Sequence, residues 1–364
     1  MKSIAAVGAS GENQIEVIQV LGHQGPPVGS GKLLHDPAQK SPKQQTISSD
    51  AKPPLFPSEP GLDVPVLLIA FRRPNLTARV LEAIRGARPQ RLFVAVDGPR
   101  AHFTTEAEQV AATRTLISSN IDWPCQLEQL HQPHNLGCRH GVEAALNWFF
   151  SQVNEGIVLE DDIVPLPSFF PYCRELLEIY RDDPAIGAIA GASVDPRPSA
   201  QGPSYRFSQF LPIWGWASWR RAWQLHDPAL PQWPQLRNSR LLEQLGGPRF
   251  ARVMGSRIDE VAGKRCDTWD YGWFLSCWQA GLLGCVPAVN LVRNVGFRDP
   301  MAVHTKLDHS FLPSPRELNL PLVHPRDRRL DRRLDQRLLD RLYAPSLQLR
   351  TWRRLVRLWP GEKS

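Results

Sequence analysis

Three consecutive carboxylates, Glu160, Asp161 and Asp162, directly follow the apolar run 156–159. Adjacent like charges repel, so this cluster needs either solvent or a cation beside it. An all-oxygen set suits Mg²⁺ or Mn²⁺, which take few protein ligands and keep positions for phosphate oxygens. Alternation along a strand places Glu160 and Asp162 on one side and Asp161 on the other, which divides metal binding from contacts with a sugar or ribose. A solvated acidic turn before Pro165 is the alternative interpretation.

Charged side chains also stand at the ends of two other apolar runs. Asp97 follows run 92–96, and Arg72 and Arg73 follow run 64–71. In an open α/β sheet, ligands bind at the carboxyl ends of the strands. We therefore expect these side chains and the acidic cluster to converge on one edge of a sheet.

From residue 64 onward, short apolar runs alternate with segments of helical periodicity. Such alternation is typical of a parallel sheet covered by helices. The runs predict strands at 64–71, 92–96, 125–130, 156–159 and 186–190. The segments between and after them predict helices at 76–84, 106–118, 142–149 and 168–180. The predicted fold class is α/β, a Rossmann-like, mixed and mostly parallel sheet flanked by helices, whereas the short apolar piece 15–21 fits a strand or a helical turn equally well.

Composition excludes several classes of protein. The chain has 364 residues, and its longest apolar run, 64–71, is far short of the roughly 18 to 20 residues of a membrane helix. The segment 325–360 contains eleven Arg and four Asp, and it therefore accounts for the whole net charge of +7. The rest of the chain is therefore neutral, and we expect no nucleic-acid partner. Six scattered cysteines without a C-x-x-C pair predict buried free thiols in a reducing, cytoplasmic compartment.

Composition also predicts three regions. Residues 1–61 are rich in polar residues, Gly and Pro, which predicts a flexible leader before a domain at 62–315. A basic amphipathic tail follows at 316–364. Its leucines repeat every four residues at Leu330, Leu334, Leu338 and Leu342, and its last part mixes Trp with Arg, as in helices that lie on anionic membranes. We expect such a surface as a partner and a peripheral location at the inner membrane, unless the leucines pack on the domain instead.

The ordered motifs resemble the GT-A-fold glycosyltransferases that use nucleotide sugars, within them the N-acetylglucosaminyltransferase I-like branch and related bacterial, family 2-like enzymes. The matching segments, in the order of that family, are 65–73, 96–98, 135–140, 158–162, 214–216 and 269–270. The resemblance covers roughly residues 64 to 305. It implies a GT-A-like domain, a nucleotide-sugar donor, and Mn²⁺ or Mg²⁺ as cofactor.

The resemblance also implies roles for the donor-side residues. Asp162 would bind the metal that bridges the donor diphosphate, with His304 as a further candidate ligand. Asp97 matches the acid that hydrogen-bonds uracil, and Arg73 matches a basic residue near the ribose and phosphates. The remaining donor-binding candidates are Arg72, Arg139, His140, Glu160 and Asp161. Arg139 and His140 are also ordinary residues for a helix start, and a lone His such as His304 is more often structural.

On the acceptor side, Asp270 matches the catalytic base of inverting enzymes. A carboxylate removes the proton of the acceptor hydroxyl while the metal neutralises the leaving diphosphate. Asp267 is its rival. The acceptor-binding candidates are Trp214, Trp216 and Trp269. Trp219 and Trp223 lie four residues apart, which predicts buried positions on one helix.

The resemblance as a whole implies a metal-dependent, inverting glycosyltransferase that moves a sugar from a nucleotide sugar, a UDP-sugar above all, to a glycan or lipid-linked acceptor. A sugar nucleotidyltransferase is the alternative within enzymes. Such enzymes open with a Gly-rich phosphate loop, which does not follow run 64–71. A non-catalytic glycan-binding protein is the alternative outside enzymes.

Overall fold

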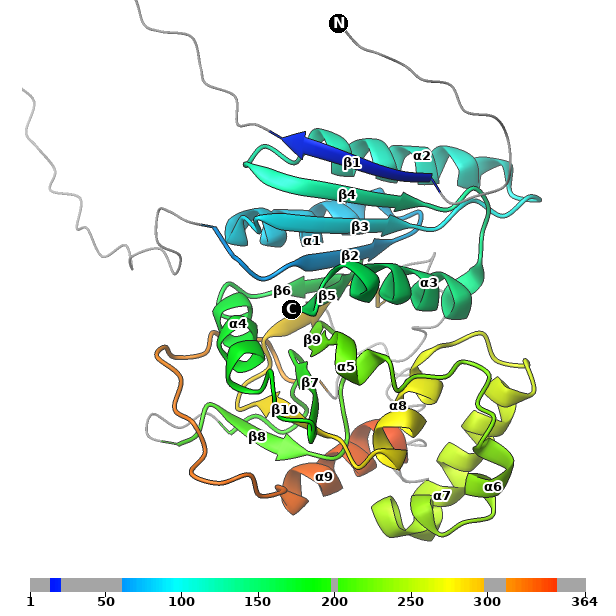
Figure 1. Cartoon of the computed structure of the whole chain (residues 1–364), viewed down its shortest axis with the longest axis vertical. Helices are drawn as coiled ribbons and strands as arrows, with labels where there is room; N and C mark the ends of the chain where they lie inside the picture. The colour runs from blue at the N-terminus through cyan, green and yellow to red at the C-terminus, as the bar shows by residue number, and fades with distance from the viewer. Residues whose placement is uncertain (1–13, 21–60, 198–201, 298–311, 346–364) are drawn as a thin grey trace, which may run out of the picture.

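A nine-stranded sheet is the frame of the computed structural model, which describes residues 14–20 (backbone only), 61–197, 202–297 and 312–345 (Figure 1). The strands follow the order β1-β4-β3-β2-β5-β9-β7-β10-β8. Their bounds are β1 Gln14–Val20, β2 Val66–Ala70, β3 Arg91–Val96, β4 Cys125–His131, β5 Glu155–Glu160, β7 Ile186–Ala190, β8 Tyr205–Ser208, β9 Trp216–Trp219 and β10 Leu283–Pro287. A separate ribbon pairs β6 (Ile163–Pro165) with β11 (Val292–Asn294).

The sheet is mixed, and most of its strands are parallel. Strands β2, β3, β4, β5, β7 and β10 run in one direction, whereas β1, β8 and β9 run in the other. The predicted α/β class, with a mixed and mostly parallel sheet flanked by helices, is therefore confirmed. Residues 15–20 of the apolar piece 15–21 belong to edge strand β1, which pairs along the whole length of β4.

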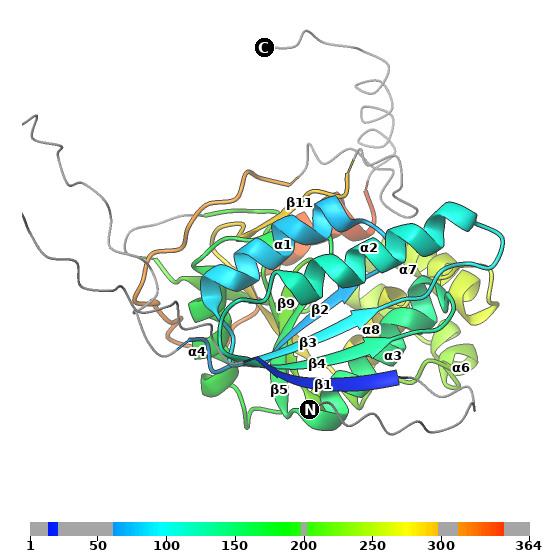
Figure 2. The same cartoon turned by 90° about the horizontal axis from the view of Figure 1, so that it is seen from above.

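Helices cover both faces of the sheet. Their bounds are α1 Pro74–Ala87, α2 Thr104–Ser119, α3 Gly137–Gln152, α4 Phe169–Ile179, α5 Arg220–Trp223, α6 Trp233–Arg237, α7 Leu241–Ala262, α8 Asp270–Gln279 and α9 Arg332–Leu338. Helices α1 and α2 lie on one face of strands β2 to β4, and α3 lies on the other (Figure 2). Along β2, Val66 and Leu68 face the core under α1, whereas Leu67 faces the core under α3. This two-sided burial explains why the strand is apolar throughout.

Two tryptophans of the Trp-rich segment depart in part from their predicted placement. Trp219 and Trp223 are both buried, as expected, but Trp219 ends strand β9 and only Trp223 lies on helix α5. The reason is the pairing of Trp219 with Glu155 of β5, which holds Trp219 in an extended conformation.

Part of the predicted tail packs into the core. Helix α9 is followed by one π-helical turn, Leu339–Tyr343, and Leu334 and Leu338 are fully buried. The Asp331 carboxylate caps α9 by accepting the N–H groups of Arg333 and Leu334 at 3.0 Å each. The Tyr343 hydroxyl donates to the Leu211 carbonyl at 2.7 Å. These leucines therefore serve packing, and the last part of the predicted tail, 346–364, lies outside the described residues.

All six cysteines are free thiols, as predicted, and Cys125, Cys173, Cys277 and Cys285 are buried. Cys138 and Cys266 are only partly buried, which departs from the prediction. Within the described part of the chain, no helix combines the length and the apolar character that crossing a membrane requires.

The packing of α9 predicts a stability difference between two leucines of the same repeat. Leu334→Ala removes a fully buried side chain and should lower the free energy of unfolding by about 2 to 5 kcal/mol. Leu330→Ala is the matched control, since Leu330 is 38% exposed and its loss should cost about 0.5 kcal/mol or less. Chemical denaturation measures both, and equal losses would contradict this packing.

Candidate functional site

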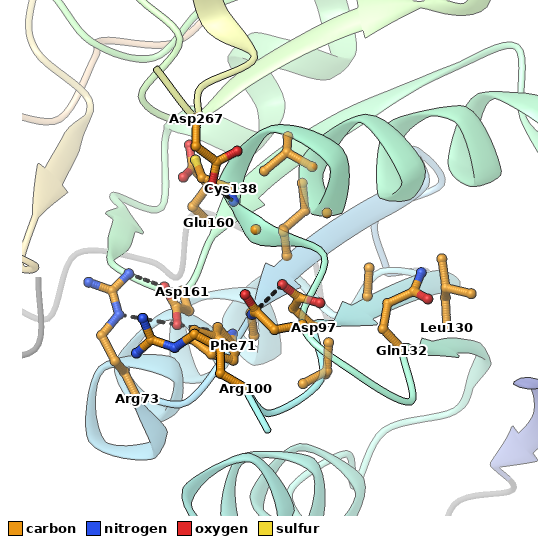
Figure 3. A pocket seen from close by; sticks show the side chains of 18 residues that line it. Phe71, Arg73, Asp97, Arg100, Leu130, Gln132, Cys138, Glu160, Asp161 and Asp267 are labelled. Atoms are coloured by element: carbon orange, nitrogen blue, oxygen red, sulfur yellow. Dashed lines mark hydrogen bonds and ion pairs between the residues drawn. The ribbon is translucent and has the colours of Figure 1, made fainter. Parts of the chain in front are cut away.

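A pocket of about 200 Å³ lies at the carboxyl ends of β2, β3 and β5, beside the start of α3 (Figure 3). Polar and charged side chains converge in it from separate elements of the sheet. The residues with such side chains are Arg73, Asp97, Arg100, Gln132, Asn135, Glu160, Asp161 and Asp267. The convergence agrees with the position of ligand sites in open α/β sheets.

The acidic cluster ends β5, and Arg73 neutralises part of it. The Arg73 guanidinium donates from Nε to Asp161 Oδ2 at 3.3 Å and makes a closer ion pair with Asp161 Oδ1. The same guanidinium lies 3.0 Å from Asp162 Oδ2. Asp161 also accepts the backbone N–H of Phe71 at 3.4 Å. Strands β2 and β5 are neighbours and parallel, so the residues that follow β2 reach the carboxylates that follow β5.

Burial makes the negative charge of this cluster costly. It raises the pKa of Glu160, and the nearby charges of Asp162 and Asp161 raise it further. Burial also raises the pKa of Asp162, although Arg73 opposes that shift. For Arg73, burial alone would lower the pKa, but the charges of Asp161 and Asp162 raise it overall. The cluster therefore favours a cation over bare negative charge.

The same cluster suits a metal ion that arrives with further ligands. Among the residues described, no group of three or more His, Cys, Asp or Glu side chains could hold a metal ion. Mg²⁺ and Mn²⁺ do not need such a group, since one or two carboxylates suffice when phosphate oxygens complete the shell. Asp162 has the required carboxylate at the strand end. A Cβ atom at Gly296 would overlap Asp162 Oδ2, so only glycine allows this close approach. His304 lies outside the described residues.

Asp97, at the end of β3, holds the loop that precedes α3. Its Oδ2 accepts the Asn135 side-chain amide at 2.7 Å, and its Oδ1 accepts the backbone N–H groups of Gly98 at 2.8 Å and Leu136 at 3.0 Å. Burial raises the pKa of Asp97, although the N–H groups of Leu136, Gly98 and Gly137 oppose this shift. Asp97 therefore lines the pocket and also fixes its wall.

Arg72 is turned away from the acidic cluster. Its guanidinium lies 2.6 Å from Oε1 of Glu106, a fully buried carboxylate on α2. Arg100 binds the same carboxylate, with its Nη2 atom 2.6 Å from Oε1. These hydrogen bonds from Arg100 outweigh burial and lower the pKa of Glu106. Arg100, rather than Arg72, lines the pocket.

The start of α3 forms another wall of the pocket. Asp267 accepts the backbone N–H groups of Cys138 and Arg139 at 2.9 Å each, and so satisfies two donors that a helix N-terminus leaves free. Gly137 has a φ of +83°, and a Cβ atom there would lie 2.6 Å from Asp267 Oδ2. Asp267, the predicted rival base, therefore has a clear structural role in this arrangement.

Arg139 and His140 point away from the pocket, although they belong to the same helix. Arg139 donates to the Val261 carbonyl at 3.1 Å and to the Pro228 carbonyl. The His140 side chain is 69% exposed and has only Glu143, at 3.4 Å, as an ion-pair partner in the described structure. Both line a neighbouring cavity, which shares Asp267 with the pocket.

Asp270 begins α8 and lies near the acidic cluster. Its Oδ1 accepts the Thr268 hydroxyl at 2.6 Å and the backbone N–H of Tyr271 at 2.9 Å. Its charge contributes to the raised pKa values of Cys138 and Glu160, after burial as the main cause. Asp270 is thus close to the pocket without being one of its lining residues.

The three candidate acceptor tryptophans lie in two environments. Trp216 and Trp269 are buried and stack on each other, with ring centres 5.8 Å apart. Trp214 is only partly buried and meets Phe297 edge to face at 6.2 Å. Only Trp214 therefore combines the predicted position with an accessible ring.

The sequence predicted no function for four polar or thiol side chains of the pocket, those of Arg100, Gln132, Asn135 and Cys138. Gln132 directly follows β4 and Arg100 lies four residues after the end of β3, so both carry the strand-end signal that identified Asp97. Cys138 carries no such signal, because its place depends on the packing of α3 against β5.

No protein-family model matches the sequence, and no curated protein matches it. Among solved structures, the chain is similar to a mannosyltransferase from Pyrobaculum calidifontis in complex with GDP-Man and Mn²⁺, at 18% identity and a TM-score of 0.30. That match covers 66% of this chain and spans 61% of the mannosyltransferase. A UDP-glucose pyrophosphorylase complexed with UDP-glucose is similar over 45% of this chain and 78% of its own, at 9% identity and a TM-score of 0.26. At these values, function has to be inferred from the residues of this chain.

Proposed function

We propose that this protein is a metal-dependent, inverting glycosyltransferase of GT-A type, which moves a sugar from a nucleotide sugar, a UDP-sugar above all, to a glycan or lipid-linked acceptor. The observation that carries the proposal is the convergence of Arg73, Asp97, Glu160 and Asp161 on one pocket, with Asp162 beside it at the Arg73 guanidinium. The ordered motifs of the sequence support the same assignment, because each of these residues belongs to one of them.

In this proposal the pocket holds the donor. Asp97 and its loop face the nucleobase, and Arg73 binds the ribose or the phosphates. Asp162 would hold Mn²⁺ or Mg²⁺, which when bound neutralises the charge of the leaving diphosphate. Glu160 and Asp161, which line the pocket next to it, contact the sugar part of the donor. Arg100 joins these residues as a further cation toward the phosphates, since it lines the pocket.

The base removes a proton from the acceptor hydroxyl as that oxygen attacks the anomeric carbon. We assign this role to Asp270, which matches the base in the ordered motifs and accepts hydrogen bonds from Thr268 and Tyr271 through Oδ1. Asp267 instead uses both carboxylate oxygens to cap the start of α3. The bond to the leaving diphosphate breaks as the new bond forms on the opposite face of the sugar, so the configuration inverts. Trp214 is the candidate platform for the acceptor, since its ring is accessible next to Phe297.

A lipid-linked acceptor would bring the protein to a membrane surface. Residues 346–364 contain Trp352, Trp359 and four arginines, with no acidic residue before Glu362. This composition is typical of segments that bind anionic lipid surfaces. We therefore include peripheral attachment at the inner membrane in the proposal.

The donor site predicts a binding pattern that one series of measurements checks. Thermal shifts of the protein with UDP-, GDP- and dTDP-sugars, with and without Mn²⁺, should show stabilisation by one nucleotide class that requires the metal. At a ligand concentration of 100 times Kd, the gain is about 2.7 kcal/mol. Asp162→Asn should abolish the dependence on Mn²⁺, whereas Asp122→Asn, at an exposed surface ion pair, should behave as the wild type. Equal nucleotide binding by Asp162→Asn with Mn²⁺ would refute the metal assignment.

The two aspartates near the acceptor side predict different defects. Asp270→Asn should keep donor affinity but lower turnover by roughly 10² to 10⁴, the contribution of a general base. Asp267→Ala should instead lower stability by about 1 kcal/mol, because it removes the cap of α3. Calorimetry measures donor binding, and release of nucleoside diphosphate with acceptor present measures turnover. Near-normal turnover of Asp270→Asn would remove it as the base.

The tail predicts lipid binding that can be separated from folding. Deletion of residues 346–364 should weaken binding to vesicles containing anionic phospholipid, with an effect that shrinks as salt is added. Thermal stability should stay unchanged, since the deletion keeps Leu334, Leu338 and Tyr343. Sedimentation with vesicles and thermal unfolding measure the two properties. Absence of vesicle binding by the full chain at low salt would contradict the membrane assignment.

A further inference from the structure

The guanidinium of Arg73 occupies the position next to Asp161 and Asp162 that a metal cation bound by these carboxylates would occupy. Its guanidinium touches both Asp161 and Asp162, and its side chain is only 17% exposed. Figure 3 shows it reaching across to Asp161 at the edge of the pocket. Two buried carboxylates thus share one positive charge from the chain itself.

The other arginines around the pocket are engaged elsewhere in the part of the chain that the structure describes. Arg72 and Arg100 bind the buried carboxylate of Glu106. Arg139 binds the carbonyl groups of Val261 and Pro228. Of these arginines, Arg73 is therefore the one that contacts Asp162 in the described structure.

We infer that Arg73 is an internal counter-ion that competes with the divalent metal for Asp162. The inference rests on the proposed function, in which Asp162 holds the metal. Asp162 Oδ2 lies 3.0 Å from the guanidinium and is tightly approached by Gly296, so a metal at this oxygen requires Arg73 to withdraw from it. A diphosphate gives the displaced guanidinium a new anionic partner, because guanidinium binds phosphate as it binds carboxylate.

This competition couples two binding events. The metal alone has to break an ion pair, so its affinity is lowered, whereas the metal together with a nucleoside diphosphate restores a partner for Arg73. The affinities for metal and diphosphate therefore rise together, and by linkage each raises the other by the same factor. Arg73 acts in this scheme as a positioning residue, since it decides when Asp162 is available.

Binding of Mn²⁺ alone, followed by the electron paramagnetic resonance signal of free Mn²⁺, tests the competition without any nucleotide. Arg73→Met should bind Mn²⁺ more tightly than the wild type by roughly tenfold, within the usual range of coupling between sites. Arg100→Met is the matched control, because it removes an equal charge from the same pocket while leaving the pair with Asp162 intact. Arg73→Lys keeps a charge but not the planar fork, and should give an intermediate affinity.

Repeating the titrations with UDP and with GDP tests the coupling. In the wild type one of them should raise Mn²⁺ affinity by roughly tenfold, and in Arg73→Met that increase should be lost. Unchanged or weaker Mn²⁺ binding by Arg73→Met, relative to the wild type, would overturn the inference even if nucleotides bind. If neither the wild type nor any variant binds a nucleotide, the proposed function is overturned. The titration with Mn²⁺ alone would still decide whether Arg73 competes with the metal for Asp162.

A stability measurement covers the case in which Arg73→Met folds poorly. Without Arg73, Asp161 and Asp162 are buried with no cation beside them. The melting temperature of Arg73→Met should therefore be lower than that of the wild type, and Mn²⁺ should raise it again. Mn²⁺ should stabilise Arg73→Met more than the wild type. An equal shift for the two proteins would contradict the inference, and Arg73→Lys supplies the same comparison in a milder form.

Discussion

The rest of the site depends on one electrostatic constraint. Three consecutive carboxylates, Glu160, Asp161 and Asp162, stand at the end of the buried strand β5 and need a compensating positive charge. The interior of β5 is apolar on both faces, so its end has to bring the carboxylates to the edge of the sheet. There they need a positive partner. The parallel pairing of β2 with β5 supplies it, because Arg73 follows β2. Fold and charge thus define the pocket together.

The walls of the pocket are held by polar groups that serve structure as well as recognition. Asp97 fixes the loop before α3, and Asp267 caps the helix itself. Glu106 forms ion pairs with Arg72 and Arg100, which hold both guanidinium groups at one side of the pocket. These carboxylates satisfy backbone donors or arginines that would otherwise remain unpaired near the pocket. Hydrogen bonds and ion pairs within the chain therefore fix these walls, which favours pre-organised binding of a charged ligand.

The sequence was informative about strands and strand ends, since alternation of apolar runs predicts a sheet and the residues that follow each run lie at its edge. It was less informative about side-chain direction. Arg72 and Arg73 are adjacent, yet one meets Glu106 on α2 and the other meets Asp161. Trp214 and Trp216 are two residues apart, yet only Trp216 lies in the core. These differences arise from tertiary packing, which local patterns do not contain. The same holds for Leu334, whose burial depends on residues far away in the sequence.

The central claim is that Asp162, beside this pocket, holds a metal together with a nucleoside diphosphate bound in the pocket. Anomalous diffraction at the manganese edge, from crystals grown with Mn²⁺ and the nucleoside diphosphate that binds best, tests it most directly. The account predicts a manganese peak beside Asp162, with the diphosphate between the metal and Arg73 and the base near Asp97. A well-ordered nucleotide bound elsewhere, or a manganese peak away from the end of β5, would contradict it.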